Sequence, residues 1–204
     1  MRRVAMLLAV LWLAAATCAA ASLSAPEKLV RDTTDQVLQV LKEHKTEIKE
    51  NPNRVYGYVR ELVLPHFDFK LMSQFVLARA WRSASQEQRE KFVDEFRTLL
   101  IRTYGKSLAE YSGQTVDFLP MQSDPSRGRV TVRTEIIQED GPKIPLDYNL
   151  YKTDDGWKVF DVVVDGISLV QNYRSSFNDE IRNGGLDALI QRLAKRNAEE
   201  GASQ

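Results

Sequence analysis

Residues 130–164 read VTVRTEIIQEDGPKIPLDYNLYKTDDGWKVFDVVV, and this stretch decides the fold. Apolar residues recur at every second position in runs that begin at Val130, Ile144 and Phe160. A period of two is typical of β-strands that bury one face. The runs are separated by Asp140-Gly141-Pro142 and Asp154-Asp155-Gly156, which favour turns. Connections this short predict antiparallel hairpins.

The segments on both sides of this stretch have other periods. Val116 and Phe118 predict one more strand, whereas earlier and later segments show the spacing of helices. The predicted helices run from Pro26 to about Glu50, from about Val55 to just before Pro65, from Asp68 to Ala80, from Ser85 to about Ser112, and from Gly166 onward with a pause at Gly184-Gly185. Helices, then hairpin strands, then helices predict an α+β fold, with one curved antiparallel sheet of about four strands and helices packed on one face.

The first residues predict export. Arg2 and Arg3 precede the apolar run from Val4 to Ala16, and the small residues of Ala19-Ala20-Ala21 follow. This order is typical of a cleaved secretory signal peptide, so we expect a signal at residues 1–21 and a single domain at 22–204. A lipid-modified Cys18 is the alternative. Both interpretations predict a protein of a bacterial periplasm or cell exterior.

Charge and composition exclude several classes of function. Lys plus Arg, at 28, equals Asp plus Glu, at 28, so no excess of positive charge is available for nucleic acid. Cys18, His44 and His66 are the only cysteine and histidines, so neither a disulfide nor a zinc site rich in Cys or His can form. We therefore expect no nucleic-acid partner, metal or cofactor.

Residues with catalytic potential are few. His66 lies two residues from Asp68, a spacing that would point the two side chains apart on a helix, and we interpret Asp68 as a helix N-cap. Asp161 and Asp165 flank the end of the last predicted strand and could lie at the mouth of a cavity. The nucleophile and phosphate-loop motifs of common enzymes are missing. Large apolar faces on helices and strands are abundant, but composition does not distinguish a closed core from a cavity.

Several motifs resemble one family. They are Leu64-Pro65-His66-Phe67-Asp68-Phe69, then Trp81 to Arg89, then Thr103-Tyr104-Gly105, Asp165 to Val170, and Gly184 to Leu189. With their spacing, these segments resemble the MlaC family of periplasmic phospholipid carriers, also called toluene-tolerance proteins. Two positions depart from the family pattern: Ala78 replaces a common glycine, and His66 replaces a common tyrosine.

The resemblance implies an NTF2-like fold with a hydrophobic lipid cavity between sheet and helices. It also implies a carrier of glycerophospholipids that helps to maintain the lipid asymmetry of the outer membrane. The implied partners are an outer-membrane lipoprotein and porin complex and the lipid-binding subunit of an inner-membrane ABC transporter. By similarity, Tyr104 and Ile167 face the cavity, and Arg89 and Lys143 contact partners.

The lipid-binding candidates combine these positions with the apolar faces. They are Phe69, Met72, Val76, Phe92, Phe96, Leu100, Tyr104, Val132, Ile136, Leu146, Tyr148, Phe160, Val162, Ile167 and Leu169. Two alternatives stay open at this point. One is an NTF2-like enzyme in which an aspartate pair acts on a small hydrophobic substrate, and the other is a chaperone for lipoproteins or peptides.

Overall fold

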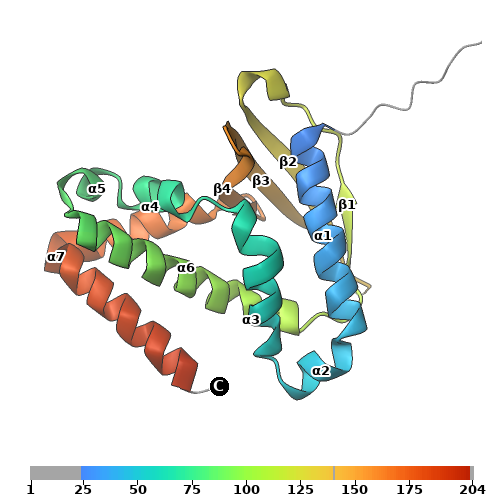
Figure 1. Ribbon diagram of the computed structural model, residues 1–204, viewed down its shortest axis with the longest axis horizontal. Helices are drawn as coiled ribbons and strands as arrows, with labels where there is room; N and C mark the ends of the chain where they lie inside the picture. The colour runs from blue at the N-terminus through green and yellow to red at the C-terminus, as the bar shows by residue number, and fades with distance from the viewer. Residues whose placement is uncertain (1–23, 140, 203–204) are drawn as a thin grey trace, which may run out of the picture.

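The computed structural model describes residues 24–139 and 141–202, and the signal peptide expected at residues 1–21 lies outside them (Figure 1). The described residues form a five-stranded antiparallel sheet and seven α-helices. The helices are α1 (Ala25–Glu43), α2 (Lys45–Glu50), α3 (Arg54–Tyr58), α4 (Phe69–Leu77), α5 (Arg79–Ser83), α6 (Gln86–Ala109) and α7 (Leu169–Ala202). The strands are β1 (Thr115–Phe118), β2 (Arg129–Ile137), β3 (Ile144–Thr153), β4 (Gly156–Val164) and β5 (Ile167–Ser168).

Side-chain caps fix the starts of two helices as the sequence predicts. The Ser85 hydroxyl accepts a hydrogen bond from the Gln88 amide at 3.1 Å, and the Gln88 side chain accepts one from the Ser85 amide at 2.9 Å. This capping box satisfies backbone donors in the first turn of α6. At α4, the Asp68 carboxylate accepts from the Leu71 amide at 2.8 Å, which confirms the predicted N-cap.

Two predicted helices are less regular than their apolar spacing suggests. The second continues beyond α3 through a π-helical segment, η1 (Val59–Val63), into a 3-10 turn, η2 (Leu64–His66), that contains Pro65. Proline fits there because the first turn of a helix leaves its amides unpaired. The third is divided into α4 and α5 at Ala78, whose φ of 48° and ψ of −106° are not helical. The prediction of one helix from 68 to 80 is therefore wrong at this residue.

The sheet is a meander with the strand order β1-β2-β3-β4-β5. Across its centre, Val132 of β2 is opposite Tyr148 of β3, which is opposite Val162 of β4. The fifth strand, which the sequence does not predict, has only two residues. It follows a turn in which Asp165 and Gly166 have positive φ values of 49° and 78°. Asp-Gly in this conformation is typical of a tight hairpin turn.

A β-bulge interrupts the alternation of β4. Val159 pairs with Leu150 and Asp161 pairs with Asn149, so Phe160 is an extra residue without a partner in β3. Its ring lies 6.0 Å from that of Tyr151, which points away from the face of Leu150. The prediction that Phe160 shares a face with Val162 is therefore wrong, because a bulge shifts the register by one residue.

Helices contact both faces of the sheet, whereas the sequence predicts one. Val30 of α1 packs with Val130, Val132 and other residues of one face (Figure 1). On the other face, the Asp161 carboxylate accepts hydrogen bonds from the Ser168 hydroxyl at 2.7 Å and the Val170 amide at 3.1 Å. These bonds attach the start of α7 to β4. None of the described helices, the long α7 included, has the length and apolar character that a membrane crossing needs.

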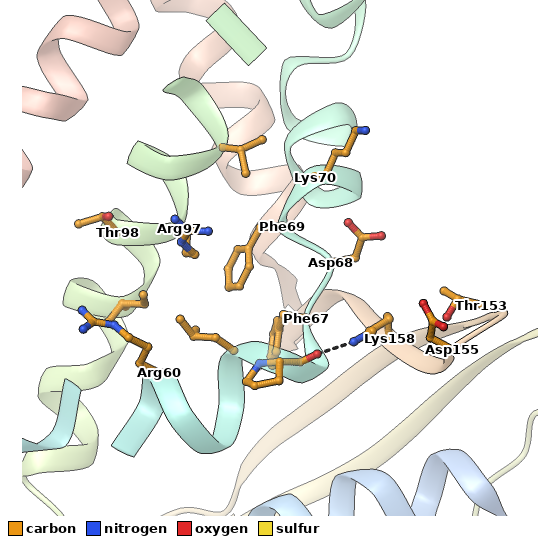
Figure 2. Close-up of a pocket in the computed structure, with 14 residues that line it drawn as sticks. Arg60, Phe67, Asp68, Phe69, Lys70, Arg97, Thr98, Thr153, Asp155 and Lys158 are labelled. Atoms are coloured by element: carbon orange, nitrogen blue, oxygen red, sulfur yellow. Dashed lines mark hydrogen bonds between the residues drawn. The ribbon is translucent and has the colours of Figure 1, made fainter. Parts of the chain in front are cut away.

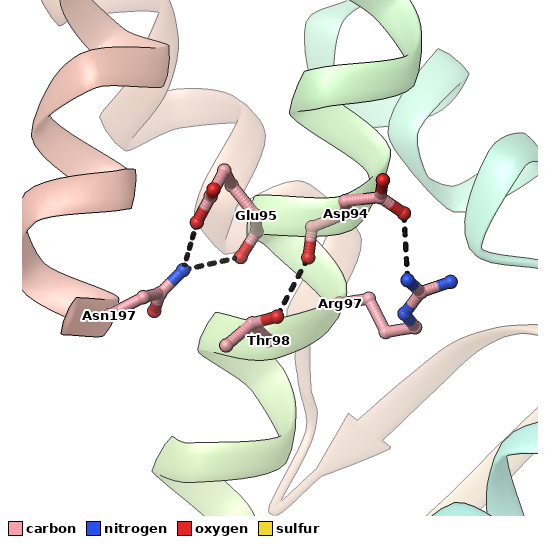
Figure 3. A network of polar contacts seen from close by, with 5 residues as sticks. All are labelled: Asp94, Glu95, Arg97, Thr98 and Asn197. Carbon is pink, nitrogen blue, oxygen red and sulfur yellow. Dashed lines mark hydrogen bonds and ion pairs between the residues drawn. The ribbon is translucent and has the colours of Figure 1, made fainter. Parts of the chain in front are cut away.

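A second core lies among the helices. Residues of α4, α6 and α7 interlock there around Phe92, Phe96 and Phe177, whose rings stack or meet edge to face. The α7 helix changes direction at Gly185, where φ is 81° and ψ is 170°, in agreement with the predicted pause. Beyond it, the Asn197 side chain donates to the carbonyl and the carboxylate of Glu95 in α6, at 3.0 and 2.7 Å (Figure 3).

Candidate functional site

The apolar strand residues predicted to line a cavity share one face of the sheet, with Phe160 as the exception. Val132, Tyr148 and Val162 form one row across it, Leu146 pairs with Val164 in the next row, and Ile136 pairs with Ile144 toward the hairpin. Val132 and Val162 are buried against α1 in the same cluster as Leu169, whereas Ile136, Leu146 and Tyr148 are only partly buried. This face is closed by α1 at one end and less tightly covered toward the β2–β3 hairpin.

Tyr148 lies at the centre of this face and is only partly buried as a residue. Burial raises the pKa of its phenol to about 12. A lipid cavity beside this face stays a prediction.

The helical residues predicted as cavity lining mostly belong to a closed core. Met72, Val76, Phe92 and Phe96 are at most 1% exposed, and Leu100 is 7% exposed. They contact one another and residues of α7. Contact of these residues with lipid stays a prediction, and their burial puts them behind more accessible side chains. Phe69, at the start of α4, is partly buried and lines a pocket described below.

Tyr104 and Ile167 are the large hydrophobic residues that the described part of the chain exposes most. Tyr104, on α6, is 37% exposed, and Ile167, on β5, is 60% exposed. Burial and the neighbouring Tyr173 hydroxyl raise the pKa of Tyr104 to about 12. The Asp165-Gly166 turn places Ile167 opposite Val164, at the end of the apolar face. The prediction that they face a lipid cavity stays a prediction, and their exposure leaves both side chains accessible to a ligand.

A pocket of about 930 Å³ lies between η1, η2, α4, α6 and the β3–β4 hairpin (Figure 2). It falls within the range of about 300–1,000 Å³ that is usual for ligand sites. Its residues are Arg60, Leu64, Pro65, Phe67, Asp68, Phe69, Lys70, Val93, Arg97, Thr98, Ile101, Thr153, Asp155 and Lys158. Except for Phe69, sequence reasoning missed them as site residues. The spacing of Val93, Arg97 and Ile101, one turn apart on α6, is the signal that could have shown a common face.

The two residues predicted to contact partners differ in their surroundings. The Arg89 guanidinium donates to the Trp81 carbonyl at 2.9 Å and to the Arg82 carbonyl at 3.3 Å, and it lies 5.4 Å from the centre of the Trp81 ring. It therefore fastens α5 to α6. Lys143 is exposed on the β2–β3 hairpin, where it forms an ion pair with Glu135 at 3.0 Å.

The candidate catalytic residues have structural partners. Asp161 is 8% exposed, and its two carboxylate oxygens accept the bonds that cap α7. Asp165 lies in an exposed turn, where its backbone has a positive φ. The Asp68 carboxylate, the N-cap of α4, also accepts a bond from the Tyr151 hydroxyl. Burial and the nearby Lys158 ammonium lower the pKa of His66.

Two known proteins are similar to this chain over most of their length. The toluene tolerance protein Ttg2D of Pseudomonas putida is 30% identical over 163 residues, which are 79% of this chain and 75% of that protein. The intermembrane phospholipid transport system binding protein MlaC of Haemophilus influenzae is 27% identical over 173 residues, which are 83% of this chain and 81% of that protein.

A solved structure is similar along almost its whole length. It is a phospholipid-binding protein from Ralstonia solanacearum in complex with a phospholipid, with a TM-score of 0.80 and 33% sequence identity. The match covers 87% of this chain and 99% of that chain. The family model described as MlaC protein matches residues 31–195. The resemblance inferred from the motifs is confirmed, and the chain belongs to the MlaC family.

Proposed function

We propose that this protein is a periplasmic phospholipid carrier. It carries lipid between an outer-membrane lipoprotein and porin complex and the lipid-binding subunit of an inner-membrane ABC transporter. This transport maintains outer-membrane lipid asymmetry. Residues 1–21 serve as the export signal and residues 22–204 as the carrier domain. The observation that carries the proposal is the similarity, at a TM-score of 0.80, to a protein solved with a bound phospholipid.

The physical need for a carrier is large. A phospholipid in water exposes about thirty methylenes, and at roughly 0.8 kcal/mol each this costs about 25 kcal/mol. An apolar cavity replaces one hydrocarbon environment with another, so lipid can enter and leave with little net change in free energy. Lipid transfer by this route requires accessible apolar surface and no covalent step.

The apolar face beside Tyr148 is the proposed place for the acyl chains. Leu146, Val164, Ile136 and Tyr148 lie on this face and are only partly buried. Tyr104 and Ile167 line the opening in this proposal, because they are large, apolar and exposed. The headgroup stays in solvent, which predicts weak headgroup selectivity.

Extraction of the purified protein with organic solvent, followed by mass spectrometry, tests the function. We expect glycerophospholipid at about one molecule per chain or less. A small hydrophobic metabolite would support the NTF2-like enzyme instead, and a bound acylated peptide would support a chaperone. Either result would contradict the carrier proposal.

Charge at the opening tests the site. Ile167→Glu should remove most co-purified phospholipid, because a carboxylate next to the acyl chains would lose its hydration. The chain should stay folded, since Ile167 is 60% exposed. Ile167→Ala is the matched control, which shortens the side chain without charge and should keep most of the lipid. Leu100→Glu, which the sequence also suggests, is unsuitable because Leu100 lies inside the helical core.

Partner contacts are tested with separate variants. Lys143→Glu should weaken binding to the transporter subunit while lipid stays bound, because Lys143 is exposed on a hairpin. Unchanged affinity for the transporter subunit would show that Lys143 is not part of the interface. Arg89→Glu also breaks the bonds to the Trp81 and Arg82 carbonyls. A loss of partner affinity in this variant is therefore evidence for docking only if its melting temperature equals that of the unmodified protein.

A further inference from the structure

Residues 64–68, here called the connector, run from η1 past the sheet to α4. The connector begins with the 3-10 turn Leu64–His66 and ends at Asp68, the N-cap of α4. Between them, Phe67 forms an isolated parallel bridge with Val159 of β4. Because Phe67 packs against both the helical core and the sheet core, the connector joins these two parts of the molecule.

Three hydrogen bonds hold the connector on the sheet. The Asp68 amide donates to the Val159 carbonyl at 2.9 Å, and the Tyr151 hydroxyl donates to the Asp68 carboxylate. The third bond runs from the Lys158 ammonium of β4 to the Pro65 carbonyl, at 2.5 Å (Figure 2). Bonds from an ionised donor are roughly twice as strong as bonds between neutral groups. Lys158 is therefore a main anchor of the connector.

His66 lies next to this anchor, because it directly follows Pro65. Burial and the Lys158 ammonium lower the pKa of its imidazole, so the ring is mostly neutral at pH 7. Within the described ranges, the ring has no hydrogen bond or ion pair that would stabilise its charged form. Protonation therefore places a second cation beside the one that holds the connector.

The other charged groups near the connector do not compensate this repulsion. Besides Lys158, the surrounding segments carry Arg60 and Glu61 of η1, Asp68, Lys70 of α4, Asp155 of the β3–β4 turn and Asp161 of β4. The Asp68 and Asp161 carboxylates already accept hydrogen bonds from other groups. Of all these charges, that of Lys158 is the one that shifts the pKa of His66.

We propose that His66 and Lys158 form an acid-sensitive latch that holds the connector on β4. At pH 7 the neutral imidazole leaves the Lys158 ammonium bonded to the Pro65 carbonyl. As the pH falls, the imidazolium repels the ammonium, the bond to Pro65 weakens, and the connector separates locally from β4. The latch does not depend on what the protein carries, so it goes beyond the proposed function and is tested independently of it.

Proton linkage gives the direction of the effect. The pKa of His66 is lowered while the connector is attached, whereas an open connector returns the imidazole to its ordinary pKa of about 6.5. The open form therefore binds the proton more readily. The stabilising contribution of the latch is present above about pH 6.5 and is lost as the pH falls through the lowered value.

Hydrogen exchange of the full chain at pH 5 and pH 7 tests the latch. The probe is the Asp68 amide, and the internal control is the Leu119 amide, which donates to the Arg133 carbonyl at 3.0 Å beside β1. After correction for the intrinsic exchange rate, we expect the protection of Asp68 to be about threefold or more lower at pH 5, with Leu119 unchanged. An equal loss at Leu119 would overturn the proposal, because the opening would then be global.

Variants assign the pH dependence to the two residues. His66→Gln cannot become a cation and should abolish the pH dependence at Asp68. His44→Gln removes the only other histidine and should keep it. A full pH dependence in His66→Gln would overturn the latch.

An NMR titration of the imidazoles tests the role of the ammonium. Lys158→Gln should raise the pKa of His66, whereas Lys152→Gln, at an exposed position of β3, should leave it unchanged. The His44→Gln variant identifies which imidazole signal belongs to His66. The same His66 pKa in Lys158→Gln and in the unmodified protein would overturn the pairing of the two residues.

Discussion

Ala78, the residue that joins α4 to α5, has a strained backbone. Its φ of 48° and ψ of −106° lie where a Cβ is unfavourable, and such backbone costs about 1–3 kcal/mol. Ala78→Gly should therefore raise the free energy of unfolding by about 1 kcal/mol, after the greater chain entropy of glycine is subtracted. Urea denaturation followed by circular dichroism measures the change.

A nearby alanine supplies the control for this prediction. Ala80 lies in the helical backbone of α5, so Ala80→Gly should lower stability by up to about 1 kcal/mol. If both glycine variants are destabilised to the same extent, Ala78 carries no strain.

Gly105 marks a close approach of α6 to α3. A Cβ at this position would lie 2.7 Å from Cε1 of Tyr56, well inside van der Waals contact. Gly105→Ala should lower the free energy of unfolding by about 1–3 kcal/mol, because the Tyr56 ring must move within its cluster.

The control for this prediction is a glycine in open space. Gly57→Ala places its Cβ more than 4 Å from other atoms, so it should instead stabilise α3 by about 0.5–1 kcal/mol. Thermal melts of both variants measure the two changes. Equal stability of the two variants would contradict the close approach.

At the scale of elements, Asn197 holds the end of α7 against α6. It is 5% exposed, and its amide group donates two hydrogen bonds to Glu95 (Figure 3). Asn197→Ala should lower the free energy of unfolding by about 1–2 kcal/mol, because both bonds are lost. Asn183→Ala, at an exposed position of the same helix, should have little effect. Urea titration measures both changes. Equal stability of the two variants would show that the bonds from Asn197 to Glu95 do not stabilise the fold.

Local patterns predict most of the elements, and tertiary contacts explain the failures. The strand alternation from Val130 to Leu150 and the Ser85–Gln88 cap are correct because each depends on neighbouring residues. The bulge at Phe160 was not predictable, since an extra residue in β4 leaves the apolar pattern of the sequence intact. The break at Ala78 was also missed, because an alanine gives no local signal of positive φ.

At the scale of the whole molecule, the buried phenol of Tyr148 predicts alkaline unfolding. Burial raises its pKa to about 12 in the folded protein, against about 10 in the unfolded chain. Between these values the unfolded chain binds fewer protons, so stability falls as pH rises from about 10 to 12, by up to about 2–3 kcal/mol. Tyr148→Phe should flatten this fall. Denaturation curves at pH 7 and pH 11 measure it, and an unchanged slope in the variant would contradict the effect of burial.

The site was predicted in part. The strand face of Val132, Tyr148 and Val162 follows from alternation alone, and it lies together as expected. The pocket of Arg60 and Arg97 could not be predicted, because its walls come from η1, α4, α6 and a hairpin that are distant in sequence. Only the assembled tertiary structure shows that they line one pocket.

The bonds from Asp161 to the start of α7 have a consequence for folding. The α7 helix receives its first-turn acceptor from a strand, so it cannot begin correctly at Leu169 until β4 is in register. The start of α7 and strand β4 should therefore unfold in one step. In native-state hydrogen exchange, the Val170 amide should require the same opening free energy as amides of β4, whereas earlier exchange at Val170 would show that helix and strand unfold independently.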